Sequence, residues 1–131
     1  MVIVHVVERV MYGGVGAVAR SLALEQFNEG HDVVVITRKS EEAEFSAWCQ
    51  KLHVNIRVSF IEHYRERRLT LWGCLSNQQI KKIREDYNGK KIIFHFHNTI
   101  ACGLISTIPE NSVCTIPVSY THLRAHETPE H

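Results

Sequence analysis

The 131-residue sequence has little net charge, no long apolar run and no closely spaced cysteine pair. Its 15 basic and 14 acidic residues give a formal net charge of +1, which predicts no bulk affinity for nucleic acid. No apolar stretch is long enough to span a membrane, and the apolar residues 2–7 are too few for a secretion signal. We therefore expect a cytoplasmic protein.

The four cysteines are widely scattered, which argues against a zinc site of paired cysteines and against a disulfide framework. We expect reduced thiols in or near the core. They are Cys49, Cys74, Cys102 and Cys114.

Strand-like and helix-like segments alternate along the chain, a pattern typical of a parallel sheet covered by helices. The expected strands are 2–7, 32–37, 54–61, 91–97 and 113–116. The expected helices are 14–29, 41–52, one ending near 88–89, and 99–106. In the first helix, the apolar residues expected to face the core are Val15, Val18, Ala19, Leu22, Ala23 and Phe27. The fold class that follows is α/β, a Rossmann-like parallel sheet with helices on both faces.

A glycine loop, Tyr12-Gly13-Gly14-Val15-Gly16, joins the first strand to the first helix. Glycines at the mouth of a parallel strand let backbone N–H groups approach an anion, and the helix N-terminus adds partial positive charge. The loop is not a P-loop, because no Gly-Lys-Ser/Thr follows at the required spacing. It predicts a ligand that carries phosphate, and Gly13, Gly14 and Gly16 are expected to line its cleft.

Two other interpretations of the loop stay open. Gly14, Gly16 and Ala19 satisfy a dinucleotide-binding pattern, and Arg38-Lys39 could accept a ribose 2′-phosphate, as in an NADP-dependent reductase half or a stand-alone binding module. Against this, residues 8–12 separate the strand from the glycines, and no acidic residue ends the second strand. The glycines could also serve only the turn and the start of the helix.

Residues 3–7, 12–16 and 22–37 resemble the N-terminal domain of family 4 retaining glycosyltransferases. Phe94-His95-Phe96-His97-Asn98 is similar to the His-x-His element of that family, and the resemblance covers nearly all of residues 1–116. It implies one half of the two-domain GT-B fold, in which the N-terminal domain mainly holds the acceptor. The C-terminal domain mainly holds the nucleotide-sugar donor.

The resemblance also implies an activity. Such enzymes transfer a sugar, with retention, from a nucleotide-diphosphate sugar to a carbohydrate or lipid-linked acceptor, here in bacterial surface polysaccharide or glycolipid synthesis. Gly13 and Gly14 would reach toward the donor phosphates. No cofactor and no metal-ion dependence is implied.

In this family a Thr-x-His follows at the end of strand five, but here Pro117 stands after Thr115-Ile116. We therefore expect no catalytic residue in the chain and an inactive fragment. Residues 117–128 resemble the translation of a sequencing adapter. We expect 1–116 to be the front of a longer protein and 117–131 to be a non-native tail; a disordered native tail is the alternative.

Four further residues are candidates for the ligand cleft. Glu8 and Arg9 follow the first strand, where open α/β sheets bind ligands. His97 could line the cleft and form hydrogen bonds there, or it could be a structural histidine at the strand end. Asn98 follows it and is also suited to cap the next helix.

The histidines of the fourth strand raise the question of a metal ion. His95 and His97 point the same way in an alternating strand, but two ligands without a third do not make a site, so we expect none. His5 and His95 are expected in the core.

The one local charge cluster, residues 63–72, holds Arg65, Arg67 and Arg68. It could contact an anionic membrane at the inner face of the bilayer or a lipid-linked phosphate acceptor. A solvated loop leading into a helix is the alternative.

Overall fold

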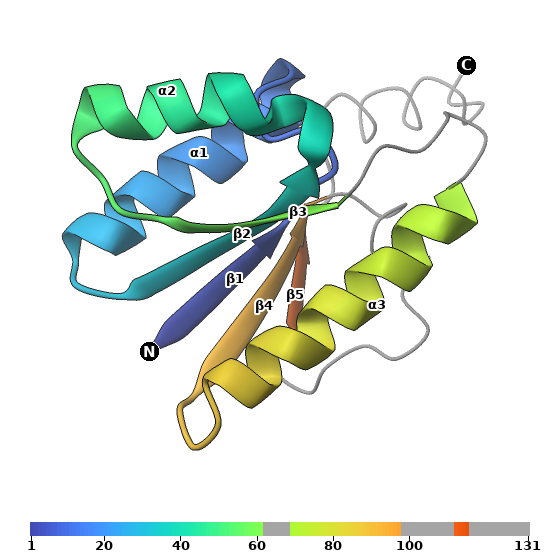
Figure 1. The fold of residues 1–131 in the computed structure, drawn as a ribbon. Coiled ribbons are helices and arrows are strands. Elements are labelled where there is room, and N and C mark those ends of the chain that lie inside the picture. The colour runs from blue at the N-terminus through green and yellow to red at the C-terminus, as the bar shows by residue number, and fades with distance from the viewer. Residues whose placement is uncertain (62–68, 98–111, 116–131) are drawn as a thin grey trace, which may run out of the picture.

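The computed structural model describes residues 1–61, 69–97 and 112–115 (Figure 1). Its elements in chain order are β1 (Val2–Val6), α1 (Gly13–Asn28), β2 (Asp32–Arg38), the 3₁₀ turn η1 (Lys39–Glu41), α2 (Glu42–Leu52), β3 (Arg57–Ile61), α3 (Leu69–Asp86), β4 (Ile92–His97) and β5 (Ser112–Thr115). All five strands are parallel and lie in the order β3-β2-β1-β4-β5. The α/β, Rossmann-like fold class predicted from the sequence is confirmed.

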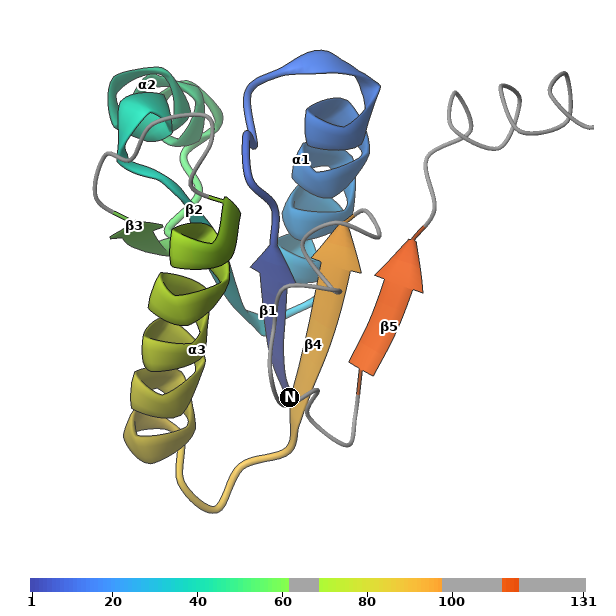
Figure 2. The ribbon, with the colours of Figure 1, turned by 90° about the vertical axis from the view of Figure 1, so that its right-hand side faces the viewer.

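Helices cover both faces of the sheet: α1 and α2 lie on one face and α3 lies on the other (Figure 1 and Figure 2). Side chains of β1 alternate between the two faces, as strand geometry requires. Val4 and Val6 belong to an apolar cluster with Ile83 of α3. Val7, directly after the strand, belongs to the opposite cluster with Ala19 of α1. Apolar side chains therefore pack against both faces of the sheet at β1.

The strand order changes direction at β1. The chain leaves β1 through α1 to reach β2, and it later returns across the other face through α3 to reach β4 on the far side of β1. His5 pairs with Val35 of β2 and with His95 of β4, so the carboxyl ends of these strands meet at one edge. Open α/β sheets bind their ligands in the crevice beside such a reversal.

Helix α1 packs on the sheet through a narrower stripe than the sequence predicts. Gly16, Ala19 and Ala23 are its buried residues, whereas Val18 is 46% exposed. The expectation that Val18 faces the core is therefore wrong. The buried residues are small, so the helix axis lies close to the sheet, and Val18 falls outside the stripe of contact.

The third strand begins at Arg57, three residues later than expected. His53 adopts the left-handed conformation with φ 55°, and the Val54 N–H donates to Cys49 O at 3.0 Å, which closes the end of α2. Residues 54–56 therefore connect α2 to β3. The helix expected at 99–106 lies outside the described residues.

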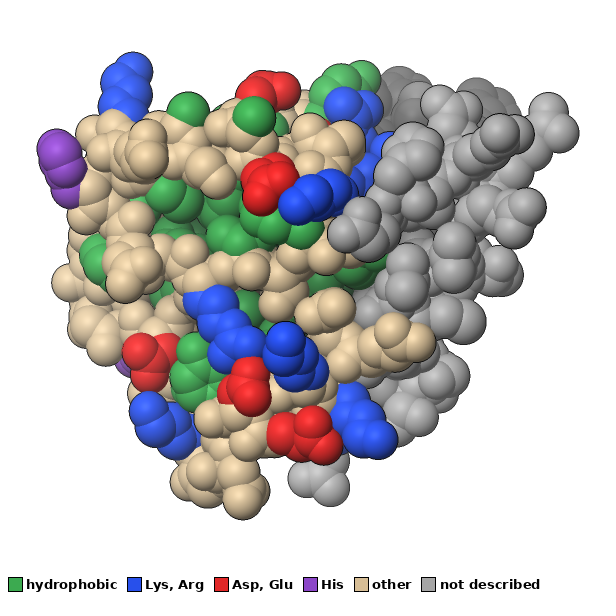
Figure 3. Space-filling model, in the orientation of Figure 1, with side chains coloured by type: hydrophobic (Ala, Val, Ile, Leu, Met, Phe, Trp, Pro, Cys, Tyr) green, Lys and Arg blue, Asp and Glu red, His purple; other side chains and the backbone are tan. Residues whose placement is uncertain are grey.

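Charges of both signs mix on the molecular surface. In Figure 3, basic and acidic side chains are interspersed among apolar and polar groups on the face in view. Among the described residues, Cys49 is a free, half-buried thiol whose pKa is raised by burial. None of the described helices is both long and apolar enough to cross a membrane.

Candidate functional site

The loop after β1 is held across the carboxyl end of β2. The Thr37 hydroxyl donates to Glu8 O at 3.1 Å and accepts from the Val10 N–H at 3.2 Å. The Arg38 N–H also donates to Glu8 O at 3.1 Å. Thr37 is fully buried, so these bonds are shielded from water and fix the path of the loop.

A buried carboxylate holds the middle of the same loop. Glu41 is 3% exposed, and its Oε1 accepts from the Met11 N–H at 2.8 Å. Its Oε2 lies 3.7 Å from Nε of Arg9, whose guanidinium carbon lies 4.2 Å from the centre of the Tyr12 ring. Arg9 is thereby placed at the mouth of β1 with 44% of its side chain exposed.

The three glycines of the loop have different roles. Gly13 begins α1 with φ +64°, a conformation that side chains disfavour. Nothing lies within 4 Å of where a Cβ on Gly13 or Gly14 would be. A Cβ on Gly16 would lie 2.6 Å from Val10 O and 2.9 Å from Arg9 O. Gly16 is buried and does not line the pocket described below, so the prediction that it lies in the cleft is wrong. Its role is to let α1 pack closely under the loop.

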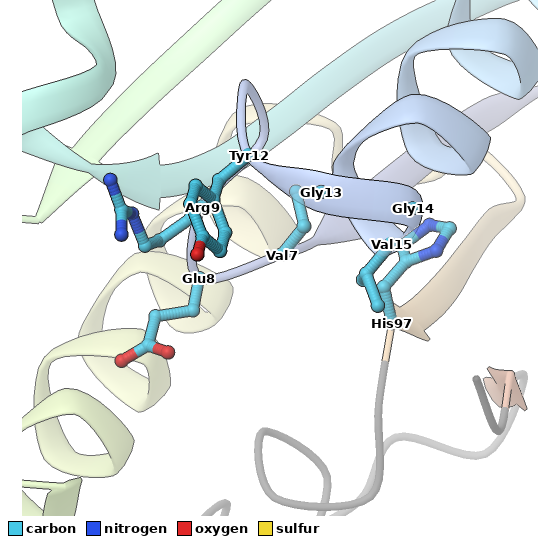
Figure 4. A pocket seen from close by; sticks show the side chains of 8 residues that line it. All are labelled: Val7, Glu8, Arg9, Tyr12, Gly13, Gly14, Val15 and His97. Atoms are coloured by element: carbon cyan, nitrogen blue, oxygen red, sulfur yellow. The ribbon is translucent and has the colours of Figure 1, made fainter. Parts of the chain in front are cut away.

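A pocket of about 300 Å³ opens at the reversal of strand order. It is formed by the end of β1, the start of α1 and the end of β4 (Figure 4). Arg9 and Tyr12 lie together on one side of the view, and His97 lies on the other side beside Val15 and Gly14. The lining residues are Val7, Glu8, Arg9, Tyr12, Gly13, Gly14, Val15 and His97. The predicted cleft residues Glu8, Arg9, Gly13, Gly14 and His97 thus come together.

The chemistry of this pocket suits an anion. Helix α1 starts beside it, and Tyr12 at its N-cap makes no side-chain capping bond. The first N–H groups of a helix have no partner within the helix and carry partial positive charge. Arg9 adds a full positive charge, while the Glu8 carboxylate pairs with Arg38 at 2.9 Å. The exposed ring of Tyr12 offers an apolar surface for stacking.

His97 is joined to a histidine of the neighbouring strand. Its Nε2 lies 2.8 Å from Nδ1 of His5, and Nε2 of His5 lies 2.7 Å from Oε1 of Gln26 on α1. Because an amide oxygen only accepts, His5 carries its proton on Nε2, and its Nδ1 accepts from the Nε2–H of His97. His97 therefore lines the pocket and also belongs to a buried side-chain network.

Burial keeps these imidazoles neutral. Desolvation lowers the pKa of His5 to about 4, with a smaller contribution in the same direction from His95 and an opposing one from Gln26. Desolvation, with the neighbouring His95 and His5, lowers the pKa of His97 to about 3. Burial lowers the pKa of His95 as well.

The sequence expectations for the remaining histidines hold in part. His5 is fully buried, as expected, but His95 is only partly buried. The sequence offered two histidines on one face of a strand, and the structure adds His5 as a third imidazole beside them. Only the pairing of β1 with β4 reveals it, because residue 5 and residue 95 are register partners.

Other predicted residues cannot be placed. Asn98, Pro117 and the three arginines 65, 67 and 68 lie outside the described residues. Comparisons with protein-family models, with curated proteins and with solved structures gave no match.

Proposed function

We propose that this chain is the acceptor-side domain of a retaining glycosyltransferase. In this proposal, the pocket at the ends of β1 and β4 helps to hold the diphosphate of a nucleotide-sugar donor. The observation that carries it is the pair Gly13 and Gly14, which line the pocket at the start of α1 with open space where side chains would be. Backbone N–H groups there can approach a phosphate without steric hindrance.

Positive charge supports the same ligand. Arg9 lies on the pocket wall, and its partner Glu41 reaches it only at 3.7 Å while also binding the Met11 N–H. The guanidinium is therefore available for a second, charge-assisted interaction with phosphate. In sugar transfer the diphosphate leaves with negative charge, which the helix terminus and Arg9 would stabilise.

His97 would act in this site as a neutral group. Its pKa of about 3 leaves it uncharged at neutral pH. A base this weak is poorly matched to proton abstraction near pH 7. We therefore assign His97 to shaping the pocket wall and to hydrogen bonding.

The dinucleotide alternative is less well supported. Dinucleotide-binding folds hold a ribose near the end of the second strand. Here the backbone of residues 8–10 bonds to Thr37 and Arg38 at that position. Arg38, the candidate for a 2′-phosphate, forms an ion pair with Glu8. A reductase half would need this loop to move away.

Further parts of the proposal rest on the sequence alone. The family resemblance implies a carbohydrate or lipid-linked acceptor and a role in surface polysaccharide or glycolipid synthesis. A cytoplasmic location is a separate expectation from the sequence, and peripheral contact with the inner face of the membrane is suggested by the charge cluster that holds Arg65, Arg67 and Arg68. It would fail if replacing the three arginines left sedimentation with anionic vesicles unchanged.

The test begins with the source DNA read across the codons for Ile116 and Pro117. We expect the reading frame to continue with a histidine after Ile116 and then to encode a second Rossmann-type domain. The protein made from that frame should melt at a higher temperature with a nucleotide-diphosphate sugar, because a ligand of the native state raises its stability. Stabilisation by NADPH and by none of the nucleotide sugars would favour the dinucleotide alternative and overturn the proposal.

A further inference from the structure

Three histidines meet on the α1 face of the sheet. His5 and His95 are register partners on adjacent strands, and His97 follows two residues later on the same face. One ring nitrogen from each lies within 4.8 Å of the other two. The rings of His95 and His97 stack with centroids 4.1 Å apart, and the His5 and His97 rings lie 5.0 Å apart.

We propose that His5, His95 and His97 form a binding site for a divalent transition-metal ion, with Zn²⁺ as its representative. Neutral imidazole is a preferred ligand for Zn²⁺ and its first-row neighbours. The expectation of no metal site rested on the presence of only two histidines, and His5 supplies the third. This inference does not depend on the proposed glycosyltransferase function.

The three ring nitrogens lie close enough together to approach tetrahedral coordination after the side chains adjust. With Zn–N bonds of about 2.0–2.1 Å, two ligand nitrogens of a tetrahedral site lie about 3.3 Å apart. The separation of 2.8 Å between Nδ1 of His5 and Nε2 of His97 is shorter. It has to widen by about half an ångström. The rings of His95 and His97, whose planes are 15° apart, also have to turn, because an imidazole binds a metal ion in its own plane.

Gln26 already orients one ligand. Zinc-binding histidines typically donate their second ring N–H to an acceptor, which fixes the tautomer and directs the other nitrogen toward the metal. The Nε2–H of His5 donates to Oε1 of Gln26 at 2.7 Å, so the lone pair of Nδ1 points into the histidine cluster. This arrangement exists before any ion binds.

The proton balance of ion binding is simple. The ion takes the place of the proton that His97 Nε2 shares with His5 Nδ1, and His97 then carries its proton on Nδ1. His5 keeps its proton on Nε2 against Gln26, so no net proton has to leave this pair.

The cluster also has a side open to an incoming ion. His5 and His97 are fully buried, but His95 is only partly buried. Beside His95 on the next strand, its register partner Val113 is 52% exposed. Three protein ligands leave one position of a tetrahedral ion for water or another exchangeable ligand.

The test is a Zn²⁺ titration of the 131-residue chain against a chromophoric chelator. His122, His126 and His131 are changed to Gln in every sample, because the first two are spaced to chelate an ion and all three lie outside the described residues. We expect one Zn²⁺ per chain. Co²⁺ in place of Zn²⁺ should give the visible absorption of a tetrahedral site.

Three variants test the site: one lacks a ligand, one is a control and one lacks the residue that orients His5. His95→Gln removes the partly exposed imidazole and leaves both hydrogen-bond partners of His5, His97 and Gln26, in place, and it should abolish stoichiometric binding. His31→Gln is the matched control, since His31 is partly buried outside the cluster. Gln26→Met removes the acceptor for His5 and should weaken binding by about 10- to 100-fold, as losses of such orienting partners do.

Melting curves without metal establish that each variant is folded. Absence of saturable Zn²⁺ binding to the parent chain overturns the proposal and leaves the histidines as a hydrogen-bonded structural network. Equal binding by the parent chain and by a folded His95→Gln variant overturns it as well. If His95→Gln does not fold, the Zn²⁺ affinity of the Gln26→Met variant provides the test. An affinity equal to that of the parent chain would contradict the proposed geometry.

Discussion

His5 on β1 and His97 on β4 share a hydrogen bond of 2.8 Å inside the protein, with exposed fractions of 0% and 1%. The bond needs one ring nitrogen without a proton, so the pair cannot be doubly charged and keep it. Burial disfavours the charged forms as well, and the pKa values fall to about 4 and about 3. The folded state therefore favours the neutral form of both imidazoles.

Stability should decrease in mild acid. Both folded pKa values lie below the unfolded value of 6.5, so the unfolded chain binds protons first as the pH falls. The contribution of each histidine is complete above about pH 6.5 and is lost as the pH falls toward its folded pKa, about 4 for His5 and about 3 for His97. Between pH 7 and pH 5 each should lower the free energy of unfolding by about 2 kcal/mol.

Urea unfolding at a series of pH values, with chelator present, measures this dependence. His97→Gln removes one of the two groups, so its free energy of unfolding should fall less steeply over the same range. The comparison concerns the slope, because the substitution also changes the stability at pH 7. Parallel slopes for the two proteins would contradict the linkage.

Gly16 should tolerate no side chain. A Cβ there would lie 2.6 Å from Val10 O and 2.9 Å from Arg9 O, so the backbone of the loop or of α1 would have to shift. Gly16→Ala should lower the free energy of unfolding by about 1–3 kcal/mol, as overpacking does. Gly14→Ala is the control, because nothing lies within 4 Å of its Cβ, and alanine is at least as good as glycine in a helix. If chemical unfolding gives the two variants the same free energy of unfolding, the close packing at Gly16 does not exclude a side chain.

Much of the fold could be predicted from the sequence because its signals are local. The apolar run 32–37 and the glycine that ends α1 fix a strand and a helix from neighbouring residues alone. The error at Val18 arose because periodicity cannot tell a helix that packs through small residues from one that packs through large ones.

The site was predicted less completely because its contacts join distant parts of the chain. Glu8, Arg9 and the glycine pair could be placed at the strand end from topology rules. The bond between Glu41 and Met11 spans 30 residues, and the bond between His5 and His97 spans 92. Such contacts depend on which strands pair and in which register, and one strand's sequence does not specify its partner.

Glu41 should be important for the stability of the loop. Glu41→Ala leaves the Met11 N–H without its acceptor in a nearly buried position, which should lower the free energy of unfolding by about 1–3 kcal/mol. Glu41→Gln keeps an oxygen acceptor and loses only the ion pair with the half-exposed Arg9, so its effect should be smaller. Chemical unfolding of both variants measures the difference. If they are equally destabilised, the charge matters more than the hydrogen bond.

Arg9 should contribute directly to anion binding in the pocket. Arg9→Gln removes a positive charge from the wall, and the loss of one charge-assisted hydrogen bond should weaken binding of inorganic pyrophosphate by roughly tenfold or more. Arg9 is 44% exposed, so the fold should persist. Isothermal titration at low ionic strength gives the affinity.

Lys90→Gln is the matched control for that experiment. Lys90 precedes β4 and pairs with Asp32 at the start of β2, so it lies at the opposite edge of the sheet from the pocket. It carries the same charge, and its removal changes the net charge of the chain by the same amount. An anion attracted only by overall charge should respond equally to both substitutions, whereas an anion bound between Arg9 and the start of α1 should respond to Arg9→Gln alone. An equal loss of pyrophosphate affinity in the two variants would therefore indicate general electrostatic attraction and count against a phosphate-binding pocket.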